Sequence, residues 1–247
     1  MTYTVITVCL NSARTIGRTI DSVLRQVPVP AEYVFVDGGS TDGTQAIIQS
    51  ASERSQQTGI PTRFQLLDQA GGRGITPAWN QGIDASTSDL VFILNSDDWY
   101  EEGCASRVLD TFAVQPDADI LFASIRAYLR GATKPARIFH NRPTWLFPVL
   151  MPFNHPATFV RRNVYNRIGR FDPNLQLLAD YDFLYRCHRA SVPYVTIDEP
   201  LVNFELGGSA NRNRPLARHE MLAVARRHGA PAPFPQLVFL ARALLGR

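Results

Sequence analysis

The sequence lacks an apolar run long enough to cross a membrane, and it has few cysteines. No stretch of 18 or more consecutive apolar residues occurs in the 247-residue chain, which argues against a transmembrane helix. The first residues enter a strand-like run without a basic segment or a small-residue cleavage site, so we expect a cytoplasmic protein. Cys9, Cys104 and Cys187 are widely spaced in apolar or helical surroundings, which favours buried free thiols over disulfides or a zinc site.

Other absences exclude further classes of protein. No G-x-G-x-x-G follows the first strand-like run, which disfavours a dinucleotide-dependent oxidoreductase. Residues 1–206 contain 18 Lys and Arg against 21 Asp and Glu, so this part gives no support to nucleic-acid binding. From Gly207 onward there are seven arginines and one acid, Glu220, and this tail is a distinct basic unit.

The chain contains strand-like and helix-like segments in alternation. Strand-like runs that are too continuously apolar for a one-sided sheet lie at about residues 4–10, 32–36, 63–67 and 89–94. A helical periodicity over 16–24 follows the capping candidates Asn11 and Ser12, and a second helix pattern follows the glycine-rich "DGGSTDG". This order predicts an α/β fold with a Rossmann-like, mostly parallel central sheet and helices on both faces.

The second half of the chain is predicted to continue with mixed elements. In order, we expect a helix at about 104–114, a strand at about 118–129, an irregular stretch at 131–148 typical of a binding loop, and a short strand at 157–160. A helix then begins near Asp180, with Phe183, Leu184 and Cys187 on its buried side. Asp180 is expected at the N-cap, and Asp182 in the first turn is interpreted as structural.

Polar and acidic residues follow the predicted strands, where α/β sheets bind their ligands. They are Asn11, Asp37, Asp68, Asn95, Ser96, Asp97 and Asp98. Carboxylates repel phosphate unless a divalent cation intervenes, so the paired acids suggest a metal bridge. Because side chains alternate along a strand, we expect Asp97 and Asp98 to differ, one holding a hydroxyl and the other the cation. The alternative is that both are turn or helix-cap residues.

Together these segments resemble the family 2 glycosyltransferases of GT-A fold, which are inverting enzymes that use nucleotide-diphosphate sugars. The matching motifs are "TVCLN" at 7–11, "VDGGSTDGT" at 36–44, "WNQGI" at 79–83, "LNSDD" at 94–98, and "HPATFVRR", "GRFD" and "ADYDFLYR" between 155 and 186. The resemblance implies a GT-A domain over 1–206, with a nucleotide-sugar-binding half at 1–100 and an acceptor half at 101–206. A basic amphipathic helical tail would follow at 207–247.

The resemblance also implies roles for individual residues. Asp37 would accept a hydrogen bond from the donor's base, Asn11 would lie on the donor side, and Asp97 would bind the ribose. Asp98 would hold a magnesium or manganese ion (Mg²⁺ or Mn²⁺) that bridges the diphosphate. Asp180 would be the general base that takes the proton of the acceptor hydroxyl, so that a single displacement inverts the anomeric carbon.

The sequence departs from the family pattern at two places. Where relatives often show Asp-Lys-Gly followed by Tyr-Asp, this chain has Gly-Arg-Gly at 72–74 and Thr76-Pro77, so no acidic role carries over, although Arg73 would still contact the diphosphate. Ala179 stands where an acid often precedes the base. His155 is an acceptor-side candidate only, because a lone histidine is more often structural.

Residues 215–228 and 234–247 mix apolar residues with arginines, which leaves two alternatives for the tail. It docks peripherally on an anionic membrane leaflet, at the inner face, and brings the enzyme to a lipid-linked acceptor. Otherwise the same helices pack on the enzyme or form a dimer.

The predicted function is transfer of a sugar from a nucleotide-diphosphate sugar, with UDP favoured, to a hydroxyl of a glycan or lipid-linked acceptor in cell-surface polysaccharide synthesis. One alternative is a catalytically silent nucleotide-sugar-binding subunit, against which the presence of Asp37, Asp98 and Asp180 argues. A sugar nucleotidyltransferase is the other alternative. It is disfavoured because "CLNSARTIGRT" at 9–19 lacks the glycines of a phosphate loop.

Overall fold

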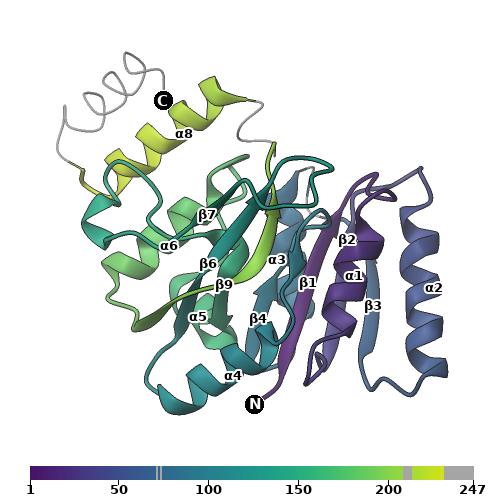
Figure 1. The fold of residues 1–247 in the computed structure, drawn as a ribbon. Helices are drawn as coiled ribbons and strands as arrows, with labels where there is room; N and C mark the ends of the chain where they lie inside the picture. The colour runs from purple at the N-terminus through teal and green to yellow at the C-terminus, as the bar shows by residue number, and fades with distance from the viewer. Residues whose placement is uncertain (71, 73, 208–212, 231–247) are drawn as a thin grey trace.

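The computed structural model describes residues 1–70, 72, 74–207 and 213–230 (Figure 1). Within these residues the strands form one nine-stranded sheet in the order β3-β2-β1-β4-β8-β6-β9-β5, and β7 pairs with β6. The strands are β1 Tyr3–Cys9, β2 Glu32–Asp37, β3 Arg63–Asp68, β4 Leu90–Ile93, β5 Trp99–Tyr100, β6 Ile120–Tyr128, β7 Arg137–Phe139, β8 Thr158–Arg161 and β9 Tyr194–Glu205.

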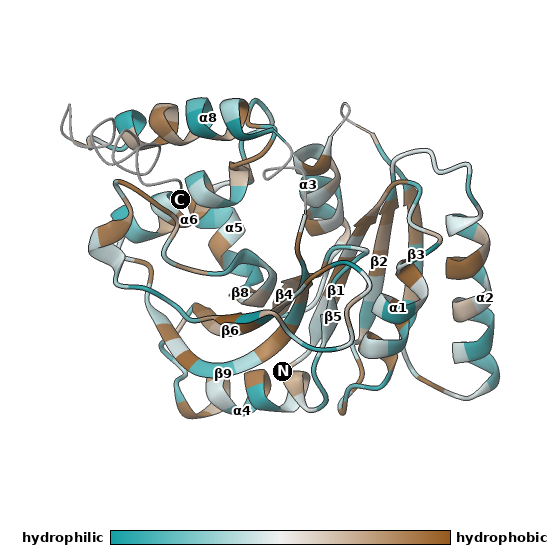
Figure 2. Ribbon diagram, turned by 45° about the horizontal axis from the view of Figure 1, so that its top comes forward, coloured by the Kyte–Doolittle hydropathy of each residue, from teal (hydrophilic) through white to brown (hydrophobic). Residues whose placement is uncertain are grey.

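Helices cover both faces of this sheet. They are α1 Ile16–Leu24, α2 Thr44–Gln57, α3 Ile75–Ala85, α4 Cys104–Val114, α5 Arg162–Ile168, α6 Ala179–Arg189 and α8 Arg214–Arg227. The apolar cluster on one face joins α1, α2 and α4 to the sheet, and the cluster on the other face joins α3, α5, α6 and α8. Neighbouring strand residues such as Val5 and Ile6 enter opposite clusters, as the pleat requires. Hydrophobic residues accordingly recur along the middle strands, and β4 is hydrophobic throughout (Figure 2).

The first four strands of the sheet run parallel and end at one edge. In the register of β1, β2 and β3, Cys9 lies beside Asp37 and Asp37 beside Asp68. Strand β4 is parallel to β1 on its other side. The loops that follow these strands therefore lie at the same edge, which is where this topology places a ligand.

The predicted α/β architecture is confirmed, with all four early strands and the helix at 104–114 in their expected places. From β8 onward the sheet is mixed, since β8 is antiparallel to both β4 and β6. The prediction that the strand at 63–67 is covered on both faces is wrong. Strand β3 lies at the edge of the sheet, and its side chains are exposed or only partly buried.

Two predicted helix caps are also wrong. Helix α1 begins after Thr15, so Asn11 and Ser12 lie too far upstream to cap it with their side chains. Helix α6 has Leu178 at its N-cap, which places Asp180 one residue inside the helix. The burial of Phe183, Leu184 and Cys187 on α6 is confirmed.

All three cysteines are buried free thiols, as predicted. Among the described residues, no helix combines the length and the hydrophobicity needed to span a bilayer.

Helix α8 packs against α6 at the end of the molecule opposite α2 (Figures 1 and 2). Val224 and Ala225 are completely buried in this contact, and Val224 belongs to the apolar cluster around α6. For residues 214–228 the structure therefore favours packing on the enzyme over membrane docking. The second tail segment, 234–247, lies outside the described residues, and membrane contact stays a prediction.

The "WNQGI" motif places a glycine where α3 crosses β1. A Cβ on Gly82 would lie 2.4 Å from Cγ2 of Ile6, closer than real atoms pack. The absence of a side chain thus allows α3 to lie directly on the central strand, and α3 in turn carries Thr76 and Asn80 to the candidate site.

We predict that Gly82→Ala lowers the free energy of unfolding by about 1–3 kcal/mol, because the added methyl forces α3 away from Ile6. The matched control is Gly17→Ala in α1, where a Cβ meets no atom within 4 Å, so stability should stay equal or rise by up to about 1 kcal/mol. Urea unfolding of both variants measures the difference. Equal stability of the two variants would contradict this account of the α3 contact.

Candidate active site

The loops that follow β1 and β2 are joined by side chain to backbone hydrogen bonds. Asn11 adopts a left-handed φ of 51°. Its backbone N–H donates to Oγ of Ser40 (2.8 Å), and its Oδ1 accepts from the N–H of Thr41 (2.9 Å). The N–H of Ser12 donates to Oγ1 of Thr44 (2.8 Å). The two loops therefore form one rigid wall at the carboxyl edge of the sheet.

Asp37, the predicted contact to the donor's base, is completely buried at the end of β2. Its Oδ2 accepts from the N–H of Gly39 (3.2 Å) and Ser40 (2.8 Å) and from Nε2 of Gln45 (2.7 Å). Burial by itself would raise the pKa of this carboxyl, but the hydrogen bonds from Ser40 and Gln45 outweigh it and hold the pKa below its usual value. Asp37 thus organises the loop at 38–45 as an ionised group, and its contact with a base stays a prediction.

The turn after β4 carries the paired acids. Asp97 lies in the turn and is partly exposed, whereas Asp98 is completely buried. Oδ1 of Asp98 accepts from the N–H of Glu205 at the end of β9 (3.1 Å). Burial, and secondly the charge of Asp97, raise the pKa of Asp98 well above its usual value. The two acids differ in burial because of their place in a turn and not because of the alternation of a strand, since β4 ends at Ile93. The predicted division of ligand roles between them stays a prediction.

Arg18 is a basic residue of this site that was not among the predicted site residues. From α1 it donates to the backbone oxygen of Asp97 (2.9 Å), and it pairs with the Glu205 carboxylate (3.3 Å). Its guanidinium lies 3.5 Å from the centroid of the Trp99 ring. The sequence signal was available, because Arg18 lies one turn inside the helix that follows the first strand, where a bound anion would be expected.

Asp98, Asn95 in the same turn and Asn203, which pairs with Trp99 between β5 and β9, carry side-chain oxygens of the kind that suits a divalent cation. Oδ2 of Asp98 and Oδ1 of Asn95 and Asn203 are buried and accept no hydrogen bond from any described residue. Such oxygens are the ligands that Mg²⁺ and Mn²⁺ prefer. In the part of the chain that the structure describes, no group of three or more His, Cys, Asp and Glu side chains gathers as a metal site. The fitting arrangement is therefore one or two carboxylates combined with the phosphates of a ligand.

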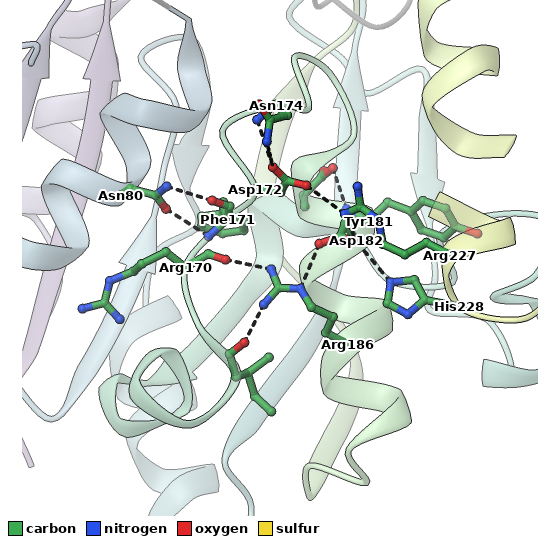
Figure 3. Close-up of polar contacts among 12 residues, drawn as sticks. Asn80, Arg170, Phe171, Asp172, Asn174, Tyr181, Asp182, Arg186, Arg227 and His228 are labelled. Carbon is green, nitrogen blue, oxygen red and sulfur yellow. Dashed lines mark hydrogen bonds and ion pairs between the residues drawn. The ribbon is translucent and has the colours of Figure 1, made fainter. Parts of the chain in front are cut away.

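The loop after β3 connects this edge to the segment that precedes α6. Arg73, the predicted diphosphate contact, lies outside the described residues. Beyond it, Oγ1 of Thr76 donates to the backbone oxygen of Leu175 (2.9 Å). The amide of Asn80 donates to the backbone oxygen of Phe171 and accepts from its N–H, at 2.9 and 3.0 Å (Figure 3). The start of α3 therefore holds residues 171–175 beside the donor-side loops.

Asp180, the predicted general base, lies at the second residue of α6. Its Oδ1 accepts from the N–H of Tyr181 (2.8 Å), and its side chain stays partly exposed. Desolvation of the carboxyl by the surrounding protein raises its pKa to about 6, and the charge of Glu220 adds to this effect. A carboxyl in this range is ionised at neutral pH and basic enough to accept a proton.

Asp182 has the structural role that the sequence suggested. It is almost completely buried, and Oδ2 pairs with Nε of Arg186 (2.8 Å). Oδ1 lies 3.2 Å from Arg227 and 3.1 Å from His228, both at the end of α8 (Figure 3). Asp182 therefore fastens α8 to α6.

His155 is enclosed in the core between the rings of Trp79 and Phe171, whose centroids lie 4.7 and 5.9 Å away. Burial lowers its pKa to about 4, so the imidazole is neutral. This position favours the structural alternative over contact with an acceptor.

The predicted binding loop at 131–148 lines a cavity of about 430 Å³. Residues 141–145 form one wall, and Tyr194, Thr196 and Asp198 in the first half of β9 form another. Asp98 contacts Glu205 at the far end of the same strand, so this cavity is separate from the paired acids.

Residues 4–176 of this chain match the sequence model of the family "Glycosyl transferase family 2". A PGL/p-HBAD biosynthesis glycosyltransferase of Mycobacterium tuberculosis is 27% identical over 191 residues, which cover 75% of this chain and 69% of the relative.

Two solved structures share the fold. The mannosyltransferase PcManGT from Pyrobaculum calidifontis, in complex with GDP-Man and Mn²⁺, matches 96% of this chain and 68% of its own with a TM-score of 0.69 and 20% identity. S. aureus TarS 1–349 in complex with UDP-GlcNAc matches 92% of this chain and 65% of its own, with a TM-score of 0.66 and 19% identity. The predicted GT-A fold is thus confirmed.

We predict that Asp37→Asn lowers the free energy of unfolding by about 1–3 kcal/mol at neutral pH, because the amide cannot accept all the hydrogen bonds of Ser40 and Gln45. The pKa of Asp37 is lowered in the folded state, so its contribution is complete above about pH 4 and is lost as the pH falls through the folded value. Urea unfolding between pH 7 and pH 3 measures this, with Asp68→Asn at the exposed end of β3 as the matched control. A difference from wild type that stays constant over that pH range would contradict the prediction.

Proposed function

The chain belongs to glycosyl transferase family 2, and from this premise we propose that it moves a sugar from a nucleotide-diphosphate sugar to a hydroxyl of a glycan or lipid-linked acceptor. The observation that carries the proposal is the pair Asp97 and Asp98 with Arg18, at the carboxyl end of the central parallel strands. The nucleotide sugars in the structures of TarS and PcManGT support a donor of this class. The name of the mycobacterial relative, a PGL/p-HBAD biosynthesis glycosyltransferase, supports sugar transfer in a biosynthetic reaction.

Charges of both signs at this edge suit a diphosphate that arrives with a cation. Asp98 is proposed to hold Mg²⁺ or Mn²⁺ through its unpaired Oδ2. The partly exposed Asp97 is proposed to accept a hydrogen bond from a hydroxyl of the ribose. When bound, the cation supplies charge stabilisation for the departing nucleoside diphosphate. Arg18 adds a fixed positive charge beside Asp97. Asn11 and Asp37 shape the wall on which the nucleoside would rest.

Asp180 is proposed as the general base. The acceptor hydroxyl oxygen forms a bond to the anomeric carbon while the bond from that carbon to the diphosphate oxygen breaks. The hydroxyl proton passes to the carboxylate of Asp180, and the nucleoside diphosphate leaves with the bonding electrons. Attack from the side opposite the leaving group inverts the anomeric carbon. A carboxyl with a pKa near 6 is suited to this transfer because it is ionised at pH 7 yet more basic than an ordinary aspartate.

We predict that wild-type protein binds either UDP or GDP more tightly with Mn²⁺ than without it, and that Asp98→Asn abolishes the gain. Asp97→Asn should weaken binding of the nucleotide by a similar factor with and without Mn²⁺, because this residue is proposed to touch the ribose. Calorimetric titration of the three proteins measures both effects. If Asp97→Asn removes the Mn²⁺ dependence and Asp98→Asn keeps it, the two roles are reversed. If neither nucleotide binds, the paired acids form only a turn.

For Asp180→Asn we predict a fall in kcat of about 10²- to 10⁴-fold with unchanged nucleotide affinity. In the wild type, kcat/KM should fall as the pH drops through about 6, because the carboxyl then becomes protonated and cannot act as a base. The measurement is UDP or GDP release from a panel that includes UDP-GlcNAc and GDP-mannose, with the anomeric configuration of the product determined by NMR. A retained anomeric configuration, or full activity of Asp180→Asn, would contradict the mechanism. Nucleotide binding without turnover of any donor would favour the silent binding subunit.

A further inference from the structure

Glu220, the one acid in the basic tail, is buried at the start of α6. Only 5% of its surface is exposed, although its sequence neighbours Arg218 and His219 face solvent. Burying a carboxylate is costly unless hydrogen-bond donors surround it. The contacts of Glu220 therefore indicate which segment of the protein α8 stabilises.

The carboxylate of Glu220 accepts three hydrogen bonds from consecutive backbone amides. Oε1 accepts from the N–H of Gln176 (2.8 Å), and Oε2 accepts from the N–H of Leu177 and of Leu178 (2.9 Å each). Leu178 is the N-cap of α6, and Asp180 follows two residues later. A side chain 42 residues away in the chain thus binds the N–H of the N-cap residue, which has no partner within the helix, and the two amides before it.

A second set of contacts from α8 holds both flanks of the same segment (Figure 3). Arg227 pairs with Asp172 (2.8 Å) and with Asp182 (3.2 Å), and His228 also contacts Asp182 (3.1 Å). The hydrogen bonds to Asp172 and Asp182 raise the pKa of the Arg227 guanidinium. Helix α8 therefore contacts the chain on both sides of Asp180, at Asp172 and at Asp182.

We propose that Glu220 is the positioning residue of the catalytic base, and that α8 is an integral part of the active site because it fixes residues 176–178 and with them the place of Asp180. The proposal rests on the function of Asp180 proposed above. It gives α8 a role within the enzyme itself.

The position of the base is set from two sides. Leu175, next to the segment that Glu220 binds, accepts the hydrogen bond of Thr76 from α3. Residues 175–178 are thus held between α3, which begins after the donor-side loop, and α8. A displacement of about 1 Å at a reacting group can cost about a hundredfold in rate, so this double hold matters for catalysis.

Glu220 also acts on Asp180 through its charge. The ionisable groups that surround the start of α6 are Glu220, Arg227 and His228 from α8, Asp172 from the preceding loop, and Asp182 and Arg186 from α6 itself. The charge of Glu220 adds to burial in raising the pKa of Asp180. Removing that charge should therefore move the acidic limb of the rate profile to lower pH.

Two substitutions in the full-length protein separate position from charge. Glu220→Gln keeps the length of the side chain but removes the charge, and turns an NH₂ group toward backbone donors. Glu220→Asp keeps the charge but shortens the reach to the amides. His219→Gln, on the exposed face of the same helix turn, is the matched control.

Hydrogen exchange gives a readout that does not depend on activity. The amides of Gln176, Leu177 and Leu178 should exchange at least about tenfold faster in both Glu220 variants than in His219→Gln, because they lose their acceptor. With the nucleotide sugar that the wild type uses, kcat should fall at least about tenfold in both variants, with unchanged affinity for UDP or GDP in the presence of Mn²⁺. The acidic limb of the plot of kcat/KM against pH should shift to lower pH in Glu220→Gln only.

Unchanged exchange at 176–178 overturns the inference, and so does a loss of kcat no larger than the unfolded fraction measured by circular dichroism. Wild-type kcat in both Glu220 variants beside an inactive Asp180→Asn overturns the inference but leaves the proposed function intact. Full activity of Asp180→Asn with accelerated exchange in Glu220→Gln overturns the proposed base instead.

Discussion

Burying a carboxylate is costly unless donors or a cation compensate its charge, and this cost governs the arrangement of the candidate site. The three aspartates proposed for the site are compensated differently. Asp37 is surrounded by donors and stays strongly acidic. Asp98 has one backbone donor and an unpaired oxygen, so its pKa is raised well above the usual value. Asp180 is intermediate, with a pKa of about 6. The three aspartates thus differ in pKa because they differ in burial and in the hydrogen-bond donors around them.

These differences follow from which backbone groups each loop leaves free. The glycine-rich loop after β2 turns its amides inward onto Asp37, and this requires the left-handed φ of 91° at Gly39. The turn after β4 offers no such group to Oδ2 of Asp98 from the described residues, and the end of β9 supplies only one amide to Oδ1. A carboxylate that the protein leaves partly uncompensated is one that a cation from outside can satisfy.

The same constraint explains why a basic tail contains one buried acid. The backbone amides before α6 need an acceptor, and no residue of the local sequence "NLQLL" at 174–178 supplies one to them in the structure as described. Glu220 supplies it from α8, while Arg227 balances the acids on either side of Asp180. Helix α8 therefore complements the charges of the segment on which it packs.

Local sequence patterns were enough to predict the early strands, the covering of the middle strands on both faces and the motifs that place acids after the strands. These depend on local patterns of hydrophobicity and on loop residues that follow each strand directly, so they can be read along the chain. The burial of Cys9, Cys104 and Cys187 was predictable for the same reason. The identity of Asp37, Asp98 and Asp180 as site candidates also came from motifs.

How each of those acids is compensated depends on contacts that form only when the chain is folded. The partners come from distant segments: Arg18 reaches Asp97 from α1, the N–H of Glu205 reaches Asp98 from β9, and Glu220 reaches the start of α6 from α8. No periodicity in the sequence encodes such contacts, because they arise from packing of elements whose mutual positions the pattern leaves open. Local sequence thus fixes which acids lie at the edge of the sheet, whereas long-range packing sets their charge and position.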